Sequence, residues 1–228
     1  MSSKDLTGKK LGIIHAAVFT ASVVQKYVEE IIPEVTVAHA GDDSVQNTNL
    51  EAPVGTIPKA NYRKFVTFAG FLEDYGVDLI LLACSTFSRA VEYAAPMINV
   101  PMLQIDRPMM DLAVRDGRRV GLVATLPSTV PSSERLLRLA AADAGREVEV
   151  KTVLSAEAFT QLRAGHPEKH NEILLEEIDR LSKEVDAIVL AQVSMTALEP
   201  MLGSTRVPVY NSGRTGVTRV REILEEKA

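Results

Sequence analysis

The chain reads VDLILLACS at residues 77–85 and, 108 residues later (185 − 77), VDAIVLAQV at residues 185–193. Both stretches are apolar without interruption in their middle, which is typical of a strand covered on both faces in a parallel sheet. The copies differ where each strand ends, because Cys84, the only cysteine, has Gln192 as its counterpart. We interpret the two stretches as parts of an internal duplication, in which these two residues share one structural position.

Two further echoes support this interpretation. Residues 8–15 (GKKLGIIH) match residues 117–124 (GRRVGLVA) at an offset of 109 (117 − 8). The dipeptide VP at residues 100–101 returns at residues 207–208. A period of about 110 residues is the size of one α/β domain. Two such domains facing each other would place equivalent loops on opposite walls of one cleft, with a thiol on one wall and an amide on the other.

Strand and helix patterns alternate along both copies. The expected strands are at residues 11–17, 35–38, 79–83, 100–106, 120–124, 147–153 and 187–191. The expected helices are at residues 23–31, 61–74, 132–144, 171–184 and 219–226, with another beginning just after Cys84 and a loop at residues 41–44. This alternation predicts an α/β fold of two similar doubly wound domains with a cleft between them. The first domain would span residues 1–106, completed by the C-terminal helix within residues 210–228, and the second would span residues 107–209.

The composition excludes several classes of protein. With 46% hydrophobic and 24% charged residues, the 228-residue chain has the composition of a globular protein, and its formal net charge of −5 argues against a nucleic-acid partner. The N-terminal residues lack the pattern of a secretory signal, and no apolar run approaches the roughly 18 residues of a membrane span. We therefore expect a cytoplasmic protein with no membrane contact. One cysteine excludes an internal disulfide and a multi-cysteine metal site.

Cys84 is the first candidate for chemistry, because ligands bind at the carboxyl edge of open α/β sheets. The helix expected just after it would surround the thiol with unpaired backbone amides, which favour the thiolate and can also hold a carboxylate. The residues of the two matching turns are Ser85, Thr86, Val193 and Ser194. The alternative interpretation is a cysteine packed in the core, followed by a serine that only caps a helix.

His15 is the second candidate, because it ends the first expected strand while its counterpart is Ala124. It would act as a base or as a donor to a substrate carboxylate, unless it is simply packed between the domains. His166 and His170 have helix-like spacing but no evident third ligand, so we expect no metal site. The glycines precede or lie within strands instead of following them, which argues against a nucleotide cofactor. Asp106 stands at the end of another expected strand.

These residues resemble a known family. The motifs ACST at residues 83–86, GRRVGLVAT at 117–125 and LAQVSM at 190–195, in this order and spacing, look like those of the aspartate/glutamate racemase superfamily. This superfamily also contains hydantoin racemases, maleate isomerases and arylmalonate decarboxylases. The resemblance covers nearly the whole chain. It implies a cofactor-independent cleft between two α/β domains, where two cysteines move a proton from opposite faces of the carbon next to a carboxylate.

Carried over residue by residue, the resemblance makes Cys84 the first thiol and puts Gln192 in the place of the second. Because glutamine neither accepts nor delivers a proton at neutral pH, the sequence argues against racemisation by two thiols. The resemblance further implies that the substrate carboxylate is bound by Ser85, Thr86, Thr125, Val193 and Ser194, with Gln192 beside them. Family members commonly form dimers or larger assemblies, so a homo-oligomer is expected.

Three functions remain open at this point. The first is a racemase or related isomerase acting next to the carboxylate of a small organic or amino acid, with Cys84 as base or nucleophile and His15 or another group supplying the second proton. The second is a lyase, such as a decarboxylase of a malonate-like acid, in which the one thiol protonates the carbanion. The third is a non-catalytic protein that binds a small acid and has lost a catalytic thiol.

Overall fold

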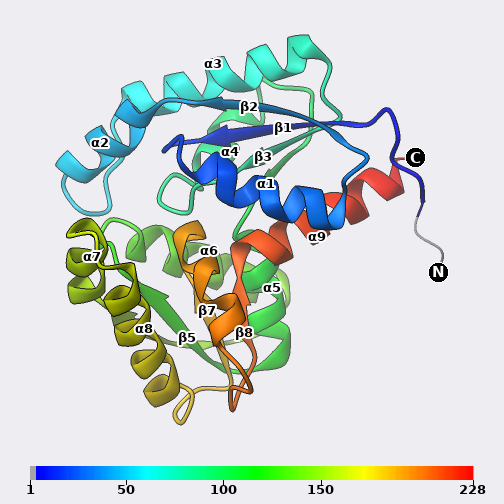
Figure 1. Ribbon diagram of the computed structural model, residues 1–228. Coiled ribbons are helices and arrows are strands. Elements are labelled where there is room, and N and C mark those ends of the chain that lie inside the picture. The colour runs from blue at the N-terminus through cyan, green and yellow to red at the C-terminus, as the bar shows by residue number, and fades with distance from the viewer. Residues whose placement is uncertain (1–3, 228) are drawn as a thin grey trace.

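The computed structural model describes residues 4–227 and contains, within them, two four-stranded parallel β-sheets (Figure 1). The first sheet has the spatial order β2-β1-β3-β4 and consists of β1 (Lys10–His15), β2 (Thr36–Gly41), β3 (Leu79–Leu82) and β4 (Met102–Gln104). The second has the order β6-β5-β7-β8 and consists of β5 (Arg119–Ala124), β6 (Glu149–Leu154), β7 (Ala187–Leu190) and β8 (Val209–Asn211). Two parallel sheets of the same strand order confirm the predicted α/β fold class.

Helices cover both faces of each sheet (Figure 1). The first sheet packs against α1 (Thr20–Ile31) and α9 (Ser212–Glu226) on one face and against α2 (Asp43–Glu51), α3 (Lys59–Tyr75) and α4 (Ala90–Ala94) on the other. The second sheet packs against α5 (Arg107–Asp116) and α6 (Val130–Asp143) on one face and against α7 (Ala156–Arg163), α8 (Pro167–Leu181) and the 3₁₀ helix η1 (Val193–Met201) on the other.

The apolar run in β3 is continuous because both faces of this strand are buried. Successive side chains of a strand point to opposite faces. Leu79 and Leu81 therefore pack with α1 and α9, whereas Ile80 and Leu82 pack with α3. Burial of each such side chain contributes about 1.5–3 kcal/mol relative to exposure. The matching strand β7 is buried at all four positions as well, so each sheet is the centre of its own core.

The strands repeat at the offsets that the sequence predicts. β1 and β5 begin 109 residues apart (119 − 10), β3 and β7 begin 108 apart (187 − 79), and β4 and β8 begin 107 apart (209 − 102). The pairing register repeats too, because Leu82 pairs with Gln104 in the first sheet and Leu190 pairs with Asn211 in the second. Cys84 and Gln192 therefore follow equivalent strands at equivalent positions.

Several expected boundaries are wrong, among them those of the helix expected at residues 171–184, which is α8 (Pro167–Leu181). Two further cases concern the first sheet. Residues 41–44 are not a loop, because α2 begins at Asp43, after Asp42 has capped it by accepting a hydrogen bond from the Ser44 amide (2.8 Å). Helix α9 begins at Ser212, seven residues before the expected start (219 − 212). Two glycines weaken the helix pattern in this first part of α9. Gly216 is required there, since a Cβ would lie 2.7 Å from the carbonyl oxygen of Ile105.

Helix α9 belongs to the core of the first sheet although it ends the chain. Its residues Val217, Val220 and Leu224 join the apolar cluster around β1 and β3, and the helix also packs against α5. The division into residues 1–106 with the C-terminal helix and residues 107–209 stays a prediction. None of the helices between residues 4 and 227 has the length and hydrophobicity needed to span a membrane.

Candidate functional site

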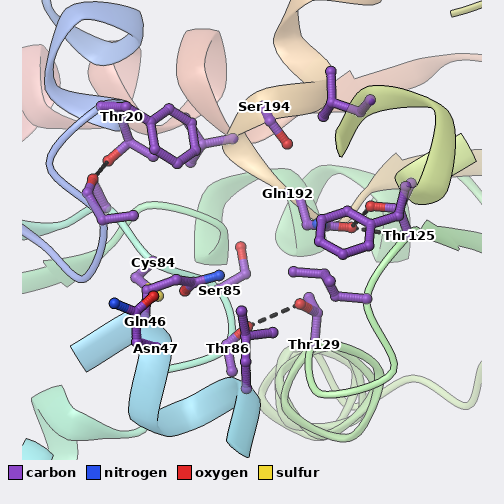
Figure 2. Close-up of a pocket in the computed structure, with 18 of the residues that line it drawn as sticks. Thr20, Gln46, Asn47, Cys84, Ser85, Thr86, Thr125, Thr129, Gln192 and Ser194 are labelled. Carbon is purple, nitrogen blue, oxygen red and sulfur yellow. Dashed lines mark hydrogen bonds between the residues drawn. The ribbon is translucent and has the colours of Figure 1, made fainter. Parts of the chain in front are cut away.

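A cavity of about 320 Å³ opens where the carboxyl-terminal ends of the two sheets meet (Figure 2). The loops after β1 and β3 and helix α2 line it from one side, and the loops after β5 and β7 and helix α7 line it from the other. This is the edge at which open α/β sheets bind ligands. Seven residues predicted from the sequence line the cavity, namely Cys84, Ser85, Thr86, Thr125, Gln192, Val193 and Ser194.

Cys84 precedes a turn and not a helix. Residues 85–89 form the turn, and α4, which follows it, has only five residues, so the helix N-terminus expected beside the thiol is absent from this part of the chain. The residue is half-buried. Burial raises the pKa of the thiol to about 12, while the Phe87 amide lowers this pKa and the charge of Asp106 raises it. At neutral pH Cys84 is therefore a protonated thiol, which must lose its proton before it can act as a base.

A second buried acid, Asp106, lies at the end of β4 and is 1% exposed. Ser88 Oγ donates a hydrogen bond to Asp106 Oδ1 at 3.3 Å, whereas Oδ2 is buried with no hydrogen-bond partner among residues 4–227. Burial raises the pKa of this carboxyl group to about 6, and hydrogen bonds from its own backbone amide and from Ser88 offset only part of that rise. An unpaired buried carboxylate is costly to the fold.

This carboxyl group should make the protein less stable as the pH rises. Its pKa of about 6 in the folded state lies above the ordinary value of 3.8. The protonated carboxyl group therefore makes its full contribution to the stability of the folded protein below pH 3.8, and this contribution is lost as the pH rises through 6. Between pH 4 and pH 7 the free energy of unfolding of the wild type should fall by about 2–3 kcal/mol relative to that of Asp106→Asn, which has no carboxyl group to titrate at this position. Urea unfolding at both pH values checks this, and parallel pH dependence of the two proteins would contradict it.

Gln192 is held in place by the loop after β5. The backbone amide and the hydroxyl of Thr125 both approach Gln192 Oε1, at 2.6 and 3.0 Å. Because a backbone amide can only donate, the atom it meets must be the oxygen of the glutamine side chain. None of the hydrogen bonds within residues 4–227 uses Gln192 Nε2. The second half of the molecule thus presents an oriented N–H donor to the cavity at the position that matches Cys84.

Two hydroxyl groups join the halves of the molecule below this amide (Figure 2). Thr86 Oγ1 and Thr129 Oγ1 lie 2.8 Å apart, both side chains are buried, and either can donate. Thr129 was not among the predicted site residues. The duplication carried a signal for it, because its counterpart at the offset of 109 is Thr20, which also lines the cavity.

His15 does not line the cavity in the described chain. Its Nδ1 lies 2.8 Å from the hydroxyl of Thr20, which does line it, and its Nε2 lies 2.9 Å from Nδ1 of His39. Thr20 donates its own proton to the Ala17 carbonyl, so His15 Nδ1 must be the donor to Thr20. Burial, and then the neighbouring His39, lower the pKa of His15 to about 4. A catalytic role for His15 stays a prediction, and it would have to act through Thr20.

The rim of the cavity comes from two helices that were not expected, α2 and α7, which face each other in Figure 1. The rim residues are Gln46, Asn47 and Leu50 from α2 and Phe159, Leu162 and Arg163 from α7. Arg163 is the only lining residue in the described chain with a formal charge, and it is exposed. Its guanidinium lies 6.0 Å from the centre of the Phe159 ring. The rim thus offers one cation beside an apolar wall.

The histidine pair considered for a metal has other partners. His170 Nδ1 lies 2.8 Å from the carbonyl oxygen of Ala158, and His166 Nδ1 lies 3.2 Å from Gln161 Oε1. Within residues 4–227, no three histidine, cysteine, aspartate or glutamate side chains are grouped as metal ligands. The polar groups that line the cavity are its thiol, hydroxyls, amides and a single guanidinium.

The comparison with known protein families bears directly on this site. The profile of the Asp/Glu/hydantoin racemase family matches residues 12–220, which includes every cavity residue named above. The chain belongs to this family. The resemblance found in the sequence is confirmed, and membership of the Asp/Glu/hydantoin racemase family places the chain among isomerases.

Individual racemases show how far the similarity extends. A glutamate racemase of Aquifex pyrophilus is 32% identical over 127 residues, which is 54% of this chain and 47% of that protein, so this match spans about half of the relative's length. A glutamate racemase of Trichodesmium erythraeum is 25% identical over 201 residues, or 86% of this chain and 71% of that protein. The structure of a glutamate racemase from Bacillus anthracis has a TM-score of 0.72 and 17% identity, covering 97% of this chain and 84% of that one. The structural likeness supports the fold.

Proposed function

We propose that the protein is a cofactor-independent racemase or related isomerase that acts at the carbon next to the carboxylate of a small organic or amino acid. The observation that carries this proposal is the position of Cys84, the only thiol of the chain, in a cavity opposite an amide that Thr125 holds in place. Cys84 exchanges the proton with the substrate carbon. We assign Gln192 Nε2 as a donor to the carboxylate and its enolate form, because Gln192 Oε1 already accepts from both donors of Thr125.

The donors matter because a proton next to a carboxylate is far less acidic than a thiol. Removal of that proton leaves negative charge on the carboxylate oxygens, and preorganised donors in a site that excludes water stabilise this charge. Gln192 Nε2 and one hydroxyl of the Thr86–Thr129 pair supply such donors, since the other hydroxyl donates to its partner. The apolar side chains of Leu126 and Phe159 line the same cavity and keep water from the reacting carbon.

The lining also suggests the class of substrate. One guanidinium, that of Arg163, can pair with one carboxylate or a similar anionic group, and the lining within residues 4–227 offers no second cation. The remaining walls are largely apolar, with Phe19 and Leu50 on one side and Phe159 and Leu162 on the other. We therefore propose a substrate with one acidic group and an apolar substituent, small enough for about 320 Å³.

Proton NMR in D₂O tests the proposal on a panel of chiral amino acids, 2-hydroxy acids, hydantoins and substituted malonates. Cys84-dependent loss of the proton signal next to the carboxylate supports the proposed reaction, and chiral chromatography of the same samples shows whether the configuration inverts. A folded protein that exchanges no proton on any member of the panel would count against the isomerase.

Arg163→Gln is expected to raise KM for an acidic substrate about tenfold with little change in kcat, since a charge-assisted contact at an open rim aids binding more than chemistry. Steady-state kinetics at low ionic strength measures the effect. Arg180→Gln, on the exposed side of α8, removes the same charge away from the cavity and is the matched control. Equal KM values for the two variants would contradict a role for Arg163 in substrate binding.

A lyase is the second candidate, and the protonated state of Cys84 favours it. A thiol whose pKa is raised to about 12 by burial is suited to deliver a proton to a carbanion. Loss of carbon dioxide from a malonate-like acid produces such a carbanion without any base, so Gln192 need not take a proton. Carbon dioxide release from substituted malonates that depends on Cys84, without proton exchange on monocarboxylic acids, would favour this candidate.

A further inference from the structure

The half of the molecule that carries the thiol also carries a buried acid beside it. β3 and β4 pair in parallel up to Leu82 and Gln104, and the Ile105 amide still donates to the Leu82 carbonyl at 3.1 Å. Cys84 and Asp106 each lie two residues beyond that last pair. Neighbouring strands are about 4.8 Å apart, so the two residues leave the sheet side by side. Cys84 lines the cavity, whereas Asp106 is buried outside its lining.

The other half has neither group. Gln192 stands in place of Cys84, and at the offset of 107 that relates β4 to β8 the counterpart of Asp106 is Gly213 (106 + 107). A Cβ on Gly213 would lie 2.5 Å from the ring of Tyr27 and 3.0 Å from Thr196 Cγ2, so no acidic side chain fits there. The thiol and the acid therefore occur together in one copy and are missing together from the other.

No other charge in the described chain compensates Asp106. Its Oδ2 and the neighbouring hydroxyl of Ser85 are both buried without hydrogen-bond partners within residues 4–227. The charged or titratable side chains of the surrounding elements are engaged elsewhere, namely His15 with His39, Arg89 with Glu92, Arg107 with Asp111 and Asp143, and Arg214 with Glu30 and Glu199. Asp106 thus has Cys84 as its one acidic neighbour.

We propose that Cys84 and Asp106 form a coupled acid pair, in which one proton is always retained because two adjacent buried negative charges cannot coexist. When Asp106 has lost its proton, Cys84 keeps its own, because giving it away would leave two adjacent negative charges. Cys84 becomes a thiolate, able to take a proton from substrate, only while Asp106 is protonated. Asp106 is thus a positioning residue that acts through the thiol, and this inference deepens the proposed function by assigning what controls its proton.

The charge state of the pair controls both reactions considered above. A reaction that begins with proton removal by Cys84 requires the state with a protonated Asp106. A reaction that ends with proton delivery by Cys84 requires a protonated Asp106 as well, because delivery leaves the thiolate. Mutual repulsion of this kind produces apparent pKa values that belong to the pair rather than to either residue.

The test needs no substrate, because Cys84 is the only thiol in the chain. Its reaction with methyl methanethiosulfonate, a small neutral reagent, is followed by intact mass between pH 5 and pH 9. In the wild type we expect the logarithm of the rate to flatten near pH 6, where Asp106 ionises, and to stay flat up to pH 9. In Asp106→Asn we expect a straight line of about tenfold per pH unit, and a rate about a hundredfold above the wild type at pH 8.

Asp74→Asn, which removes an exposed carboxylate near the end of α3, is the matched control and should keep the wild-type profile. A straight profile in the wild type, or an Asp106→Asn rate at pH 8 equal to that of the control, would overturn the proposal. Asp106→Ser serves as a second neutral variant. Failure of both neutral variants to fold would identify the carboxylate as a structural anchor and would overturn the proposal too.

This experiment separates the pair from the proposed function. A flattened profile with no proton exchange on any tested acid leaves the coupled pair in place and counts against the isomerase. Proton exchange on a tested acid, together with a straight pH profile of the thiol reaction, supports the isomerase and contradicts the proposed role of Asp106.

Discussion

Cys84→Ala is expected to lower the rate of proton exchange next to the substrate carboxylate by at least about a thousandfold. The cavity residues of the described chain include no second thiol, carboxylate or histidine that could take over the transfer. His15 is separated from the cavity by Thr20, and its neutral ring already uses both nitrogens. Loss of the α-proton signal in D₂O, measured for wild type and variant on one substrate, gives the ratio of the two rates.

Cys84→Ser is the matched control for this loss. A hydroxyl fills nearly the same space but is a far weaker acid than a thiol, so the serine variant should be almost as inactive as the alanine variant. The free energies of unfolding of both variants should lie within about 1 kcal/mol of the wild-type value, because a half-buried thiol contributes little packing. If the serine or alanine variant keeps a tenth of the wild-type rate, a group other than Cys84 must transfer the proton.

The sequence predicted the fold well because the features it depends on are local and repeated. Continuous apolar strands such as residues 79–82 carry a strong pattern, and their recurrence at residues 187–190 repeats the signal in a second place. The helices of the rim were missed for the opposite reason. Helix α2 has only two buried residues, Val45 and Asn49, so its sequence shows little amphipathic periodicity.

The candidate site was predictable where it follows from strand ends and unpredictable where it depends on long-range contacts. Cys84 and Gln192 were identified from their place after two equivalent strands. The state of Cys84 could not be predicted in this way. Burial by surrounding elements raises its pKa, and neither that burial nor the lone carboxylate of Asp106 next to it can be read from spacing alone. Arg163 was missed together with α7, the helix that brings it to the cavity.

Gln192→Cys is expected to give the protein a second proton-transferring thiol and to raise the rate of configurational inversion at least about tenfold above that of the wild type. The duplication places the introduced thiol at the position equivalent to Cys84, facing it across the cavity. The hydrogen bonds from Thr125 to the glutamine oxygen are lost in the variant, so some loss of substrate affinity should accompany the gain. Chiral chromatography with mass detection after incubation in D₂O measures inversion and deuterium uptake together.

The direction of this effect follows from the asymmetry of the two halves. The introduced thiol would have Gly213 as its neighbour across the strand pair, so no buried carboxylate would oppose its ionisation, whereas burial and, to a smaller extent, Asp106 raise the pKa of Cys84. The new thiol should therefore take the substrate proton, and Cys84 should deliver deuterium to the opposite face, so that inverted product carries the label. Gln192→Ala, which loses the same hydrogen bonds without gaining a thiol, is the control. Equal inversion rates in the two variants would show that the positions do not face one substrate carbon.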